Sequence, residues 1–364
     1  MAGSWMIYGA NGYTGLLTAE LAVARGQRPV LAGRNRATIE ALATRLGLHY
    51  KIFSLNDPEE VRLGLDGIDA VIHMAGPFSA TSAPMVDACL ATGTHYMDIT
   101  GEIGVFEAVF AKDAAAKAAG VCLIPGTGFD VVPTDCLAAM LKEQLPDATQ
   151  LELGISAVGK LSPGTTKTML EGIPRGGCVR VDGRLQTVPV AWKSKEIPFV
   201  NGTKTATSMP WGDVSTAYHT TGIPNITVYM VLPKGSSGFL KTMYGIRALV
   251  KTKSAQNILK WIVGKTVVGP DDDFRASGHS DIWGRVTNER GDWVEGALVT
   301  PEGYSLTADA SLCAVTTLLQ GPIRPGAYTP ARYFGSDFVK NLAGVEVRPP
   351  SRSETANQPV RHPS

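Results

Sequence analysis

Three glycines near the N-terminus have a spacing that suits phosphate binding. They stand in Gly9-Ala-Asn-Gly-Tyr-Thr-Gly15, directly after the short apolar run Trp5–Tyr8. Glycine lets a backbone approach a diphosphate closely, and the amides that open a following helix would face its negative charge. Asn11 stands where the commoner dinucleotide pattern has another glycine, so the surrounding elements must decide the role of this loop. The candidate phosphate contacts are Gly9, Asn11, Gly12, Tyr13, Thr14 and Gly15.

The elements needed to position this loop are predicted over the first 125 residues. Short apolar runs alternate there with helical patterns, which is typical of βαβ units in a parallel sheet. Asn35 and Asp57-Pro58 carry the residue types that begin helices. We therefore predict a doubly wound Rossmann sheet with a second mixed α/β domain behind it. The predicted strands are Trp5–Tyr8, Pro29–Ala32, Tyr50–Phe53, Ala70–Met74, His95–Ile99 and Val121–Ile124.

The turn after the second strand indicates which nucleotide would bind. An NAD site usually has an acidic residue there for the ribose 2′-hydroxyl, whereas this chain has Gly33-Arg34-Asn35-Arg36. Arg34 suits a 2′-phosphate, so NADP(H) is favoured over NAD, with Asn35 beside it and Asn56 at the adenine side after the third strand. The alternative is that Arg34 and Arg36 are solvated loop cations.

Small residues follow the fourth strand in Ala75-Gly76-Pro77-Phe78. This turn would admit the nicotinamide ribose and the diphosphate, and Pro77 is expected to keep the chain out of a helix until about Ala83. The candidate contacts here are Ala75, Gly76, Pro77 and Phe78.

Hydride transfer also calls for a proton donor near the carboxyl ends of the strands or facing them from the second domain. The candidates are Asp98, after the fifth strand, and the pair Tyr218-His219 in the aperiodic stretch 211–224. A histidine that titrates near neutrality could protonate a developing enolate. Each has a structural alternative: Asp98 could accept bonds from turn amides, and His219 could be a core residue. If the stretch is extended, only one of Tyr218 and His219 can face a ligand.

Other polar residues have weaker claims on the chemistry. Lys167 and His279 could face the sheet from the second domain. Glu102 could cap a helix that begins near Ile103, and capping explains Asp130 and Asp135 at least as well as proton transfer.

Composition excludes several classes of protein. The 364 residues carry a net charge of +1, which gives no electrostatic argument for nucleic acid or an anionic membrane as partner. The five cysteines are scattered and never paired at metal-ligand spacing, so we predict buried thiols in a reducing compartment and no metal site. We find no secretion signal and no transmembrane run, and residues 258–268, the best apolar candidate, carry two lysines. A cytoplasmic protein is therefore expected.

Taken in order, these motifs resemble the saccharopine dehydrogenase-like NADP-binding proteins, a group that includes trans-acting enoyl reductases. The resemblance covers about residues 4–140 and reappears in 303–310 and 326–335. It rests on Gly9-Ala-Asn-Gly-Tyr-Thr-Gly15, Leu31-Ala-Gly-Arg-Asn35, Ala75-Gly-Pro-Phe78, Tyr96-Met-Asp-Ile-Thr-Gly-Glu102 and Gly126-Thr-Gly-Phe-Asp-Val-Val-Pro-Thr-Asp135.

The resemblance implies an NADPH-dependent reductase of a polarised C=C bond. The expected substrate is a small molecule, and one alternative is that it is linked to a lipid or acyl group. A saccharopine-type C–N oxidoreductase is the second hypothesis, although Lys167, Arg175 and Arg180 are too dispersed to bind several carboxylates. A non-catalytic NADP-binding or assembly protein is the third. A homodimer is also implied by the resemblance.

Four regions are predicted along the chain. Residues 1–128 form the NADP-binding Rossmann domain and 129–302 the substrate and dimerisation domain. Strands of a half-exposed sheet are expected in 149–158, 180–190 and 225–232, and helices in about 165–171 and 251–264. Residues 303–345 return toward the first domain. The tail 346–364, rich in Pro, Ser and Arg, is expected to be disordered.

Overall fold

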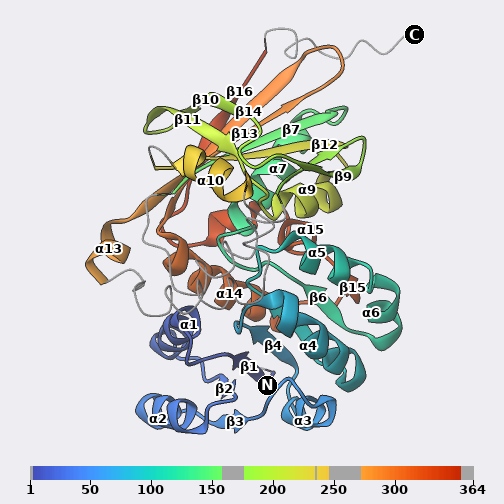
Figure 1. Cartoon of the computed structure of the whole chain (residues 1–364). Coiled ribbons are helices and arrows are strands. Elements are labelled where there is room, and N and C mark those ends of the chain that lie inside the picture. Colours follow the sequence, from blue (N-terminus) through green and yellow to red (C-terminus); the bar gives the residue numbers. More distant parts are fainter. Residues whose placement is uncertain (1–2, 158–175, 234–235, 246–271, 354–364) are drawn as a thin grey trace.

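The computed structural model describes residues 3–157, 176–233, 236–245 and 272–353. Figure 1 shows a parallel sheet formed mainly by the N-terminal third of the chain and a second sheet stacked beyond it, with helices between the two. The predicted α/β class with a Rossmann sheet and a second mixed sheet is confirmed. The predicted helices at 165–171 and 251–264 lie outside the described residues.

Within the described ranges, the first sheet has seven strands in the order β15-β6-β5-β4-β1-β2-β3, all parallel along their paired edges. Chain order reverses between β1 and β4, which is the crevice where ligands of doubly wound sheets bind. All six predicted strands are present within one or two residues. The strand bounds are β1 Trp5–Tyr8, β2 Val30–Gly33, β3 Tyr50–Ile52, β4 Ala70–His73, β5 His95–Asp98, β6 Cys122–Ile124 and β15 Gly326–Ala327.

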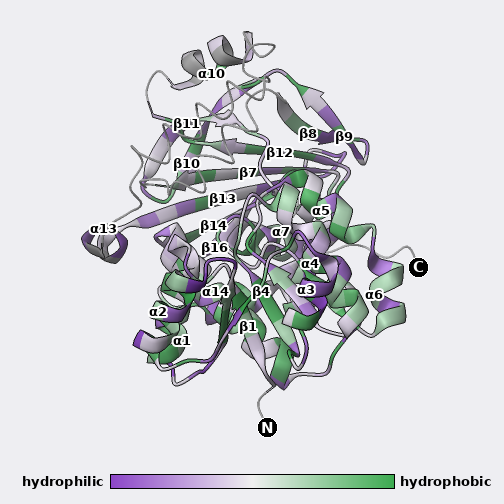
Figure 2. Ribbon diagram, turned by 60° about the horizontal axis from the view of Figure 1, so that its bottom comes forward, coloured by the Kyte–Doolittle hydropathy of each residue, from purple (hydrophilic) through white to green (hydrophobic). Residues whose placement is uncertain are grey.

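Helices cover both faces of this sheet. Ile7 and Ile72 face a core shared with α1, α2 and α14, whereas Met6 and Val71 face a core shared with α3, α4, α5 and α6. The strands β1 and β4 are buried throughout, and Figure 2 shows green, hydrophobic ribbon at β4. The helix bounds are α1 Tyr13–Ala24, α2 Arg36–Leu46, α3 Pro58–Gly64, α4 Phe78–Thr92, α5 Ile103–Phe110 and α6 Asp113–Ala119.

The second sheet is mixed and has nine strands among the residues that the structure describes. Its main path is β10-β11-β12-β7-β13-β14-β16, and the hairpin β8–β9 joins it through β12. Asp182 and Gly183 turn that hairpin with φ of 49° and 75°, as the Asp-Gly pair favours. The bounds are β7 Gln150–Ala157, β8 Gly177–Val181, β9 Arg184–Val188, β10 Ser194–Phe199, β11 Gly202–Ser208, β12 Asn225–Met230, β13 His279–Thr287, β14 Trp293–Pro301 and β16 Glu346–Arg352.

Two helices join the sheets through one continuous core. Leu137 and Leu141 of α7 lie against Gly284 and Gly296, whose missing side chains leave room for them. The helix α14 returns to pack on α1 and β4. The remaining bounds are α7 Val132–Gln144, α9 Asp213–Thr221, α10 Ser236–Gly245, α13 Asp272–Ser277, α14 Gly303–Gln320, α15 Pro330–Phe334 and the 3₁₀ helix η2 Ser336–Asn341.

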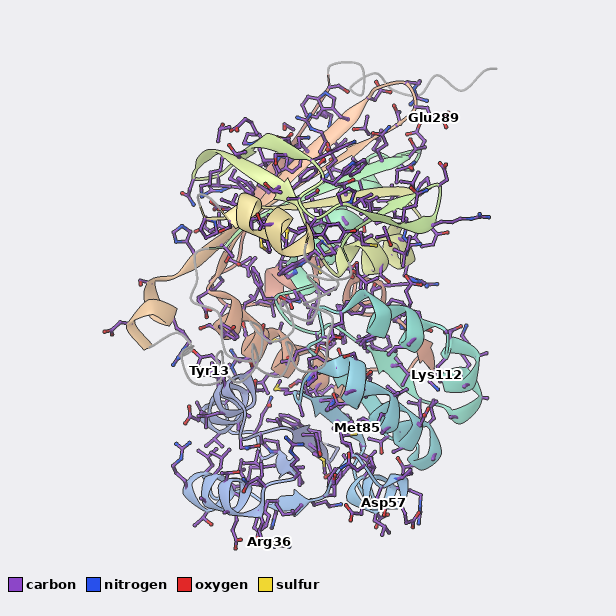
Figure 3. All side chains as sticks on the ribbon, in the orientation of Figure 1. Tyr13, Arg36, Asp57, Met85, Lys112 and Glu289 are labelled. Carbon is purple, nitrogen blue, oxygen red and sulfur yellow. The ribbon has the colours of Figure 1, made fainter. Side chains whose placement is uncertain are left out.

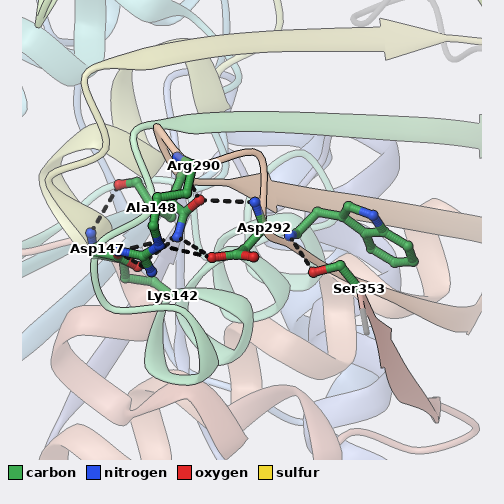
Figure 4. Close-up of polar contacts among 8 residues, drawn as sticks. Lys142, Asp147, Ala148, Arg290, Asp292 and Ser353 are labelled. Atoms are coloured by element: carbon green, nitrogen blue, oxygen red, sulfur yellow. Dashed lines mark hydrogen bonds and ion pairs between the residues drawn. The ribbon is translucent and has the colours of Figure 1, made fainter. Parts of the chain in front are cut away.

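The predicted disordered tail is wrong for residues 346–352. They form β16, which pairs antiparallel with β14 at the edge of the second sheet. Pro349 and Pro350 fall where the register shifts, so neither interrupts a regular ladder. Figure 4 shows the neighbouring β13–β14 turn, where Arg290 lies 2.9 Å from Asp147.

Two local features differ from what the sequence suggested. The stretch 211–224, for which no regular periodicity was found, contains the helix α9 at 213–221, so the condition that it be extended is not met. The helix α4 begins at Phe78 rather than near Ala83, because Pro77 takes the extended N-cap position just before it.

Candidate functional site

The glycines of the first loop allow close packing at the sheet crevice. Gly9 has a φ of +87°, and a Cβ there would lie 2.8 Å from the amide nitrogen of Ala75 after β4. A Cβ at Gly15 would lie 2.4 Å from the carbonyl oxygen of Gly9. The loop thus presses against both β4 and its own helix, and no larger residue fits at either position without moving the backbone.

The amino end of α1 is open toward that loop. Its N-cap is Gly12, which has no side chain to cap the helix, and the first turn contains no acidic residue. The amide groups around Tyr13, Thr14 and Gly15 therefore carry the positive end of the helix dipole without an internal carboxylate. This arrangement fits a diphosphate.

The amino end of α4, by contrast, is already filled. The Glu102 carboxylate accepts from the amides of Phe78 at 2.9 Å and Ser79 at 3.2 Å. Glu102 precedes α5, as predicted, but its side chain caps α4 rather than α5. Ala75, Gly76 and Pro77 can therefore border a ligand, whereas the α4 amides are not free to bind a second anion.

Asn11 lies against the end of β2. Its Oδ1 would be 3.3 Å from a Cβ placed on Gly33, so Gly33 leaves the room that the Asn11 side chain occupies. The residue that departs from the usual glycine pattern thus lies at the entrance to the second turn.

Arg34 follows Gly33 directly and is exposed. Burial raises the pKa of Tyr8 to about 12, and the Arg34 charge acts against that rise, which places the guanidinium near the end of β1. The Asn35 side chain accepts from the amide of Thr38 and caps α2, as the sequence indicated. Asn56 is exposed after β3, where Asp57 caps α3.

The Asp98 carboxylate is fully buried and accepts three hydrogen bonds. The donors are the Tyr96 hydroxyl at 2.6 Å and the amides of Thr100 at 3.0 Å and Gly126 at 2.8 Å. Burial raises the pKa of Asp98 to about 6 against these donors. The geometry fits a carboxylate that ties the turn after β5 to the turn after β6.

Tyr218 and His219 belong to a different network. The Arg180 guanidinium covers the Tyr218 ring at 4.2 Å, and it also contacts Glu107 at 2.8 Å. His219 Nε2 lies 3.8 Å from Glu107 Oε1, and its ring packs on Phe110 at 4.2 Å between centroids. His219, then Ser215 and Arg180, hold the pKa of Glu107 down at about 2.

This network lies at the far edge of the first sheet. His219 borders a pocket of about 240 Å³ together with Phe110, Lys117 and Tyr328. Tyr328 follows β15, the edge strand, which is three strands from β4 and thus about 14 Å from the crevice at usual strand spacing. The structure does not bring His219 together with Asp98.

Two aspartates predicted as caps have other contacts. The helix α7 begins after Val131 without a side-chain cap. Asp135 accepts from Thr220 of α9 and from the amide of Ala331, so it links three helices. The Asp130 carboxylate lies against Gly101, where a Cβ would be 2.5 Å from its Oδ2, and burial raises the pKa of Asp130 to about 6. The capping prediction is wrong for the start of α7.

The remaining candidates are less informative. Lys167 and Arg175 lie outside the described residues, and His279 is exposed at the start of β13. Among the residues that the structure describes, no group of His, Cys, Asp or Glu is arranged to hold a metal ion. No helix within that same part of the chain is both long and apolar enough to cross a membrane.

Comparison with known proteins decides the family of the first domain. Residues 5–124 match the family model of the saccharopine dehydrogenase NADP binding domain. The first domain belongs to this family. NADP(H) is therefore its cofactor, in agreement with the open α1 amides and with Arg34.

Two curated relatives are also similar to part of this chain. A trans-acting enoyl reductase of Mycobacterium leprae is 33% identical over 143 residues, which is 36% of this chain and 33% of that protein. A trans-acting enoyl reductase of Mycobacterium tuberculosis (strain H37Rv) is 31% identical over 140 residues, again 36% of this chain and 33% of that protein. The match spans only about a third of either relative.

The whole fold is similar to a solved structure. Apo saccharopine dehydrogenase (L-Glu forming) from Saccharomyces cerevisiae matches with a TM-score of 0.66 at 12% identity, over 96% of this chain and 100% of that one. At this identity the likeness shows the fold alone. The NADP-binding domain and the second sheet therefore form a known two-domain architecture.

One contact with the NADP-binding domain could not be predicted from the order and spacing of residues in the sequence. Arg275 of α13 donates from Nη1 to the Tyr13 hydroxyl at 2.8 Å, although the two residues are 262 positions apart. Tyr304 at the start of α14 packs edge-on to the Tyr13 ring at 4.9 Å between centroids. Neither residue was among the predicted site residues, since only the fold brings them to the glycine loop.

Proposed function

We propose that the protein is an NADPH-dependent oxidoreductase that reduces a polarised C=C bond. The observation that carries this proposal is the 31–33% identity to trans-acting enoyl reductases over 36% of this chain. Because that match ends well short of the full relatives, the substrate and the reaction are part of the proposal.

The chain's own residues bind and orient the cofactor. Bound NADPH supplies a hydride, which in this proposal goes to the β-carbon of the double bond. The amides at Gly12–Gly15 hold the diphosphate, Arg34 holds the 2′-phosphate, and the turn Ala75–Phe78 borders the nicotinamide ribose.

Asp98 supports the site by joining two of its turns. Because its carboxylate is buried and takes three donors, we propose that it holds the turns after β5 and β6 in position. A proton for the α-carbon comes from a side chain near these turns or from water. The catalytic roles predicted for Asp98, Tyr218 and His219 stay predictions, and the position of His219 at the β15 edge argues for a structural role.

A substrate panel with purified protein tests the reaction. We expect NADPH oxidation, followed at 340 nm, with an enoyl thioester or another acyl-linked enoyl compound, and formation of the saturated product by mass spectrometry. The Arg34→Ala variant at the same protein concentration is the control for cofactor-dependent turnover. Turnover of an imine or amino acid without any enoyl reduction would overturn the proposal.

The saccharopine-type C–N reaction has less support. Arg180, one of the cations that such a substrate would need, is buried and already donates to Glu107, Val214 and Gly183.

A non-catalytic NADP-binding protein would bind the cofactor but turn over no substrate in the same panel. Its cofactor binding would not change on substitution of Asp98 or His219. A homodimer and a cytoplasmic location remain predictions that solution scattering and cell fractionation would test.

A further inference from the structure

The second domain reaches the cofactor loop through the short helix α13. In Figure 1 this helix extends from the second domain on the side of the molecule where α1 lies, and Figure 3 labels Tyr13 on that side. The Arg275 guanidinium donates to the Tyr13 hydroxyl at 2.8 Å, and its Cζ lies 5.8 Å from the centre of the Tyr13 ring. A cation from the second domain is thus fixed beside the first helix.

Tyr13 brings that cation close to the open amides. It is the first residue of α1, so its own backbone belongs to the helix end that fits a diphosphate. The distance from these amides to the guanidinium is therefore spanned by one tyrosine side chain and one hydrogen bond. Tyr304 packs edge-on to the same ring and restricts its orientation.

The neighbouring carboxylate has a separate task. Glu302 accepts from the amides of Tyr304 and Ser305 and so caps α14. The Arg275 charge lowers the pKa of Glu302 against the larger effect of burial, which shows that the two groups are close. The chain thus places a positive charge next to α1, close to the carboxylate that caps α14.

We propose that Arg275 binds the diphosphate of NADP(H) from the second domain, exchanging the Tyr13 hydroxyl for a phosphate oxygen when the cofactor binds. A guanidinium forms charge-assisted hydrogen bonds with phosphate that are stronger than its bond to a neutral hydroxyl. Cofactor binding then holds α13 against α1 and closes this side of the site. The inference depends on NADP binding and not on which bond the enzyme reduces.

Two ligands separate a diphosphate contact from a general effect on the fold. NADP⁺ contains the diphosphate, whereas 2′-AMP has the adenosine and its 2′-phosphate only. We expect Arg275→Ala to weaken NADP⁺ binding roughly 10-fold or more in titration calorimetry. Binding of 2′-AMP, measured by displacement of NADPH fluorescence, is expected to stay within about 2-fold. Arg34→Ala should weaken both ligands.

Two further variants separate charge from the contact with Tyr13. Arg275→Lys keeps the charge, whereas Tyr13→Phe removes only the hydroxyl that Arg275 donates to. The proposal predicts that both variants retain most of the NADP⁺ affinity. If Arg275 only links the two domains through this hydroxyl, Tyr13→Phe will lose as much NADP⁺ affinity as Arg275→Ala.

Folding and charge controls complete the experiment. Arg348→Ala removes an exposed arginine of β16 that pairs with Glu346, and it should leave both dissociation constants unchanged. Circular dichroism checks that each variant folds. Unchanged NADP⁺ binding in Arg275→Ala, or equal loss for NADP⁺ and 2′-AMP, would overturn the proposal independently of any enoyl reductase assay.

Discussion

Replacing Arg34 by Ala tests how the protein distinguishes NADPH from NADH. Arg34 is exposed directly after β2, and its charge acts on Tyr8 at the end of β1. The neighbouring Asn35 side chain is committed to capping α2, so it cannot take over a phosphate contact without opening the helix end. Arg34 is therefore the group in this turn that we expect to hold the 2′-phosphate.

The expected loss follows from one charge-assisted contact. Hydrogen bonds to charged groups contribute about 1–3 kcal/mol, which corresponds to roughly 5- to 150-fold in affinity. Because Arg34 is exposed and screened by water, the lower half of this range applies, and we expect about 10-fold weaker NADPH binding. NADH has no 2′-phosphate, so its affinity should change by less than about 2-fold.

Fluorescence titration with both nucleotides measures the two dissociation constants on the same samples. Arg36→Ala is a matched control. Arg36 begins α2 two residues after Arg34, and its side chain lies near Tyr50, away from the crevice between β1 and β4. That variant should bind both nucleotides like the parent protein. Equal losses for NADPH and NADH in Arg34→Ala would refute the reasoning, since they would indicate damage to the loop rather than loss of a phosphate contact.

Four further substitutions test the packing and charge of the site. Gly15→Ala should lower the free energy of unfolding by about 1–3 kcal/mol in urea, because its Cβ would meet a backbone oxygen at 2.4 Å, whereas Gly12→Ala at 3.2 Å should cost less. Glu102→Ala should lower stability by about 1 kcal/mol in thermal unfolding, since two amides of α4 lose their acceptor. The pKa of Asp130 is about 6 in the folded protein against 3.8 in the unfolded chain. Between about pH 4 and 6 only the folded state keeps this proton, so the free energy of unfolding should fall as the pH rises through that range. Asp130→Asn should flatten part of that fall, and an unchanged slope would contradict a buried carboxyl.

The first sheet could be predicted because its signals are local. The central parallel strands are buried on both faces and read as short apolar runs, such as Trp5–Tyr8 and Ala70–His73. Asn35 and Asp57 cap the helices that follow them with their own side chains. In these places the residue type and the structure that it stabilises are only a few positions apart.

Distant partners explain the elements that were missed. The Thr-rich segment of α9 has weak helix propensity, and its ends are held by Thr220 on Asp135 and by Ser215 on Glu107. The strand β16 contains two prolines and exists because β14 offers it an edge with a register shift. No pattern within either segment records these partners.

The same distinction divides the candidate site. The residues proposed to hold the adenosine and diphosphate come from loops that each follow a strand, so their order in the sequence already indicated a nucleotide. The groups that we propose near the reacting end lie in the turns after β5 and β6. Asp98 illustrates the consequence: as a carboxylate at the end of a strand it suggested proton transfer, yet its donors Tyr96, Thr100 and Gly126 leave it buried and engaged. Arg275 is the opposite case, because it belongs to no recognisable motif and yet lies beside the glycine loop through its contact with Tyr13. Titrations of the Arg275 variants therefore examine the part of the site that only the fold reveals.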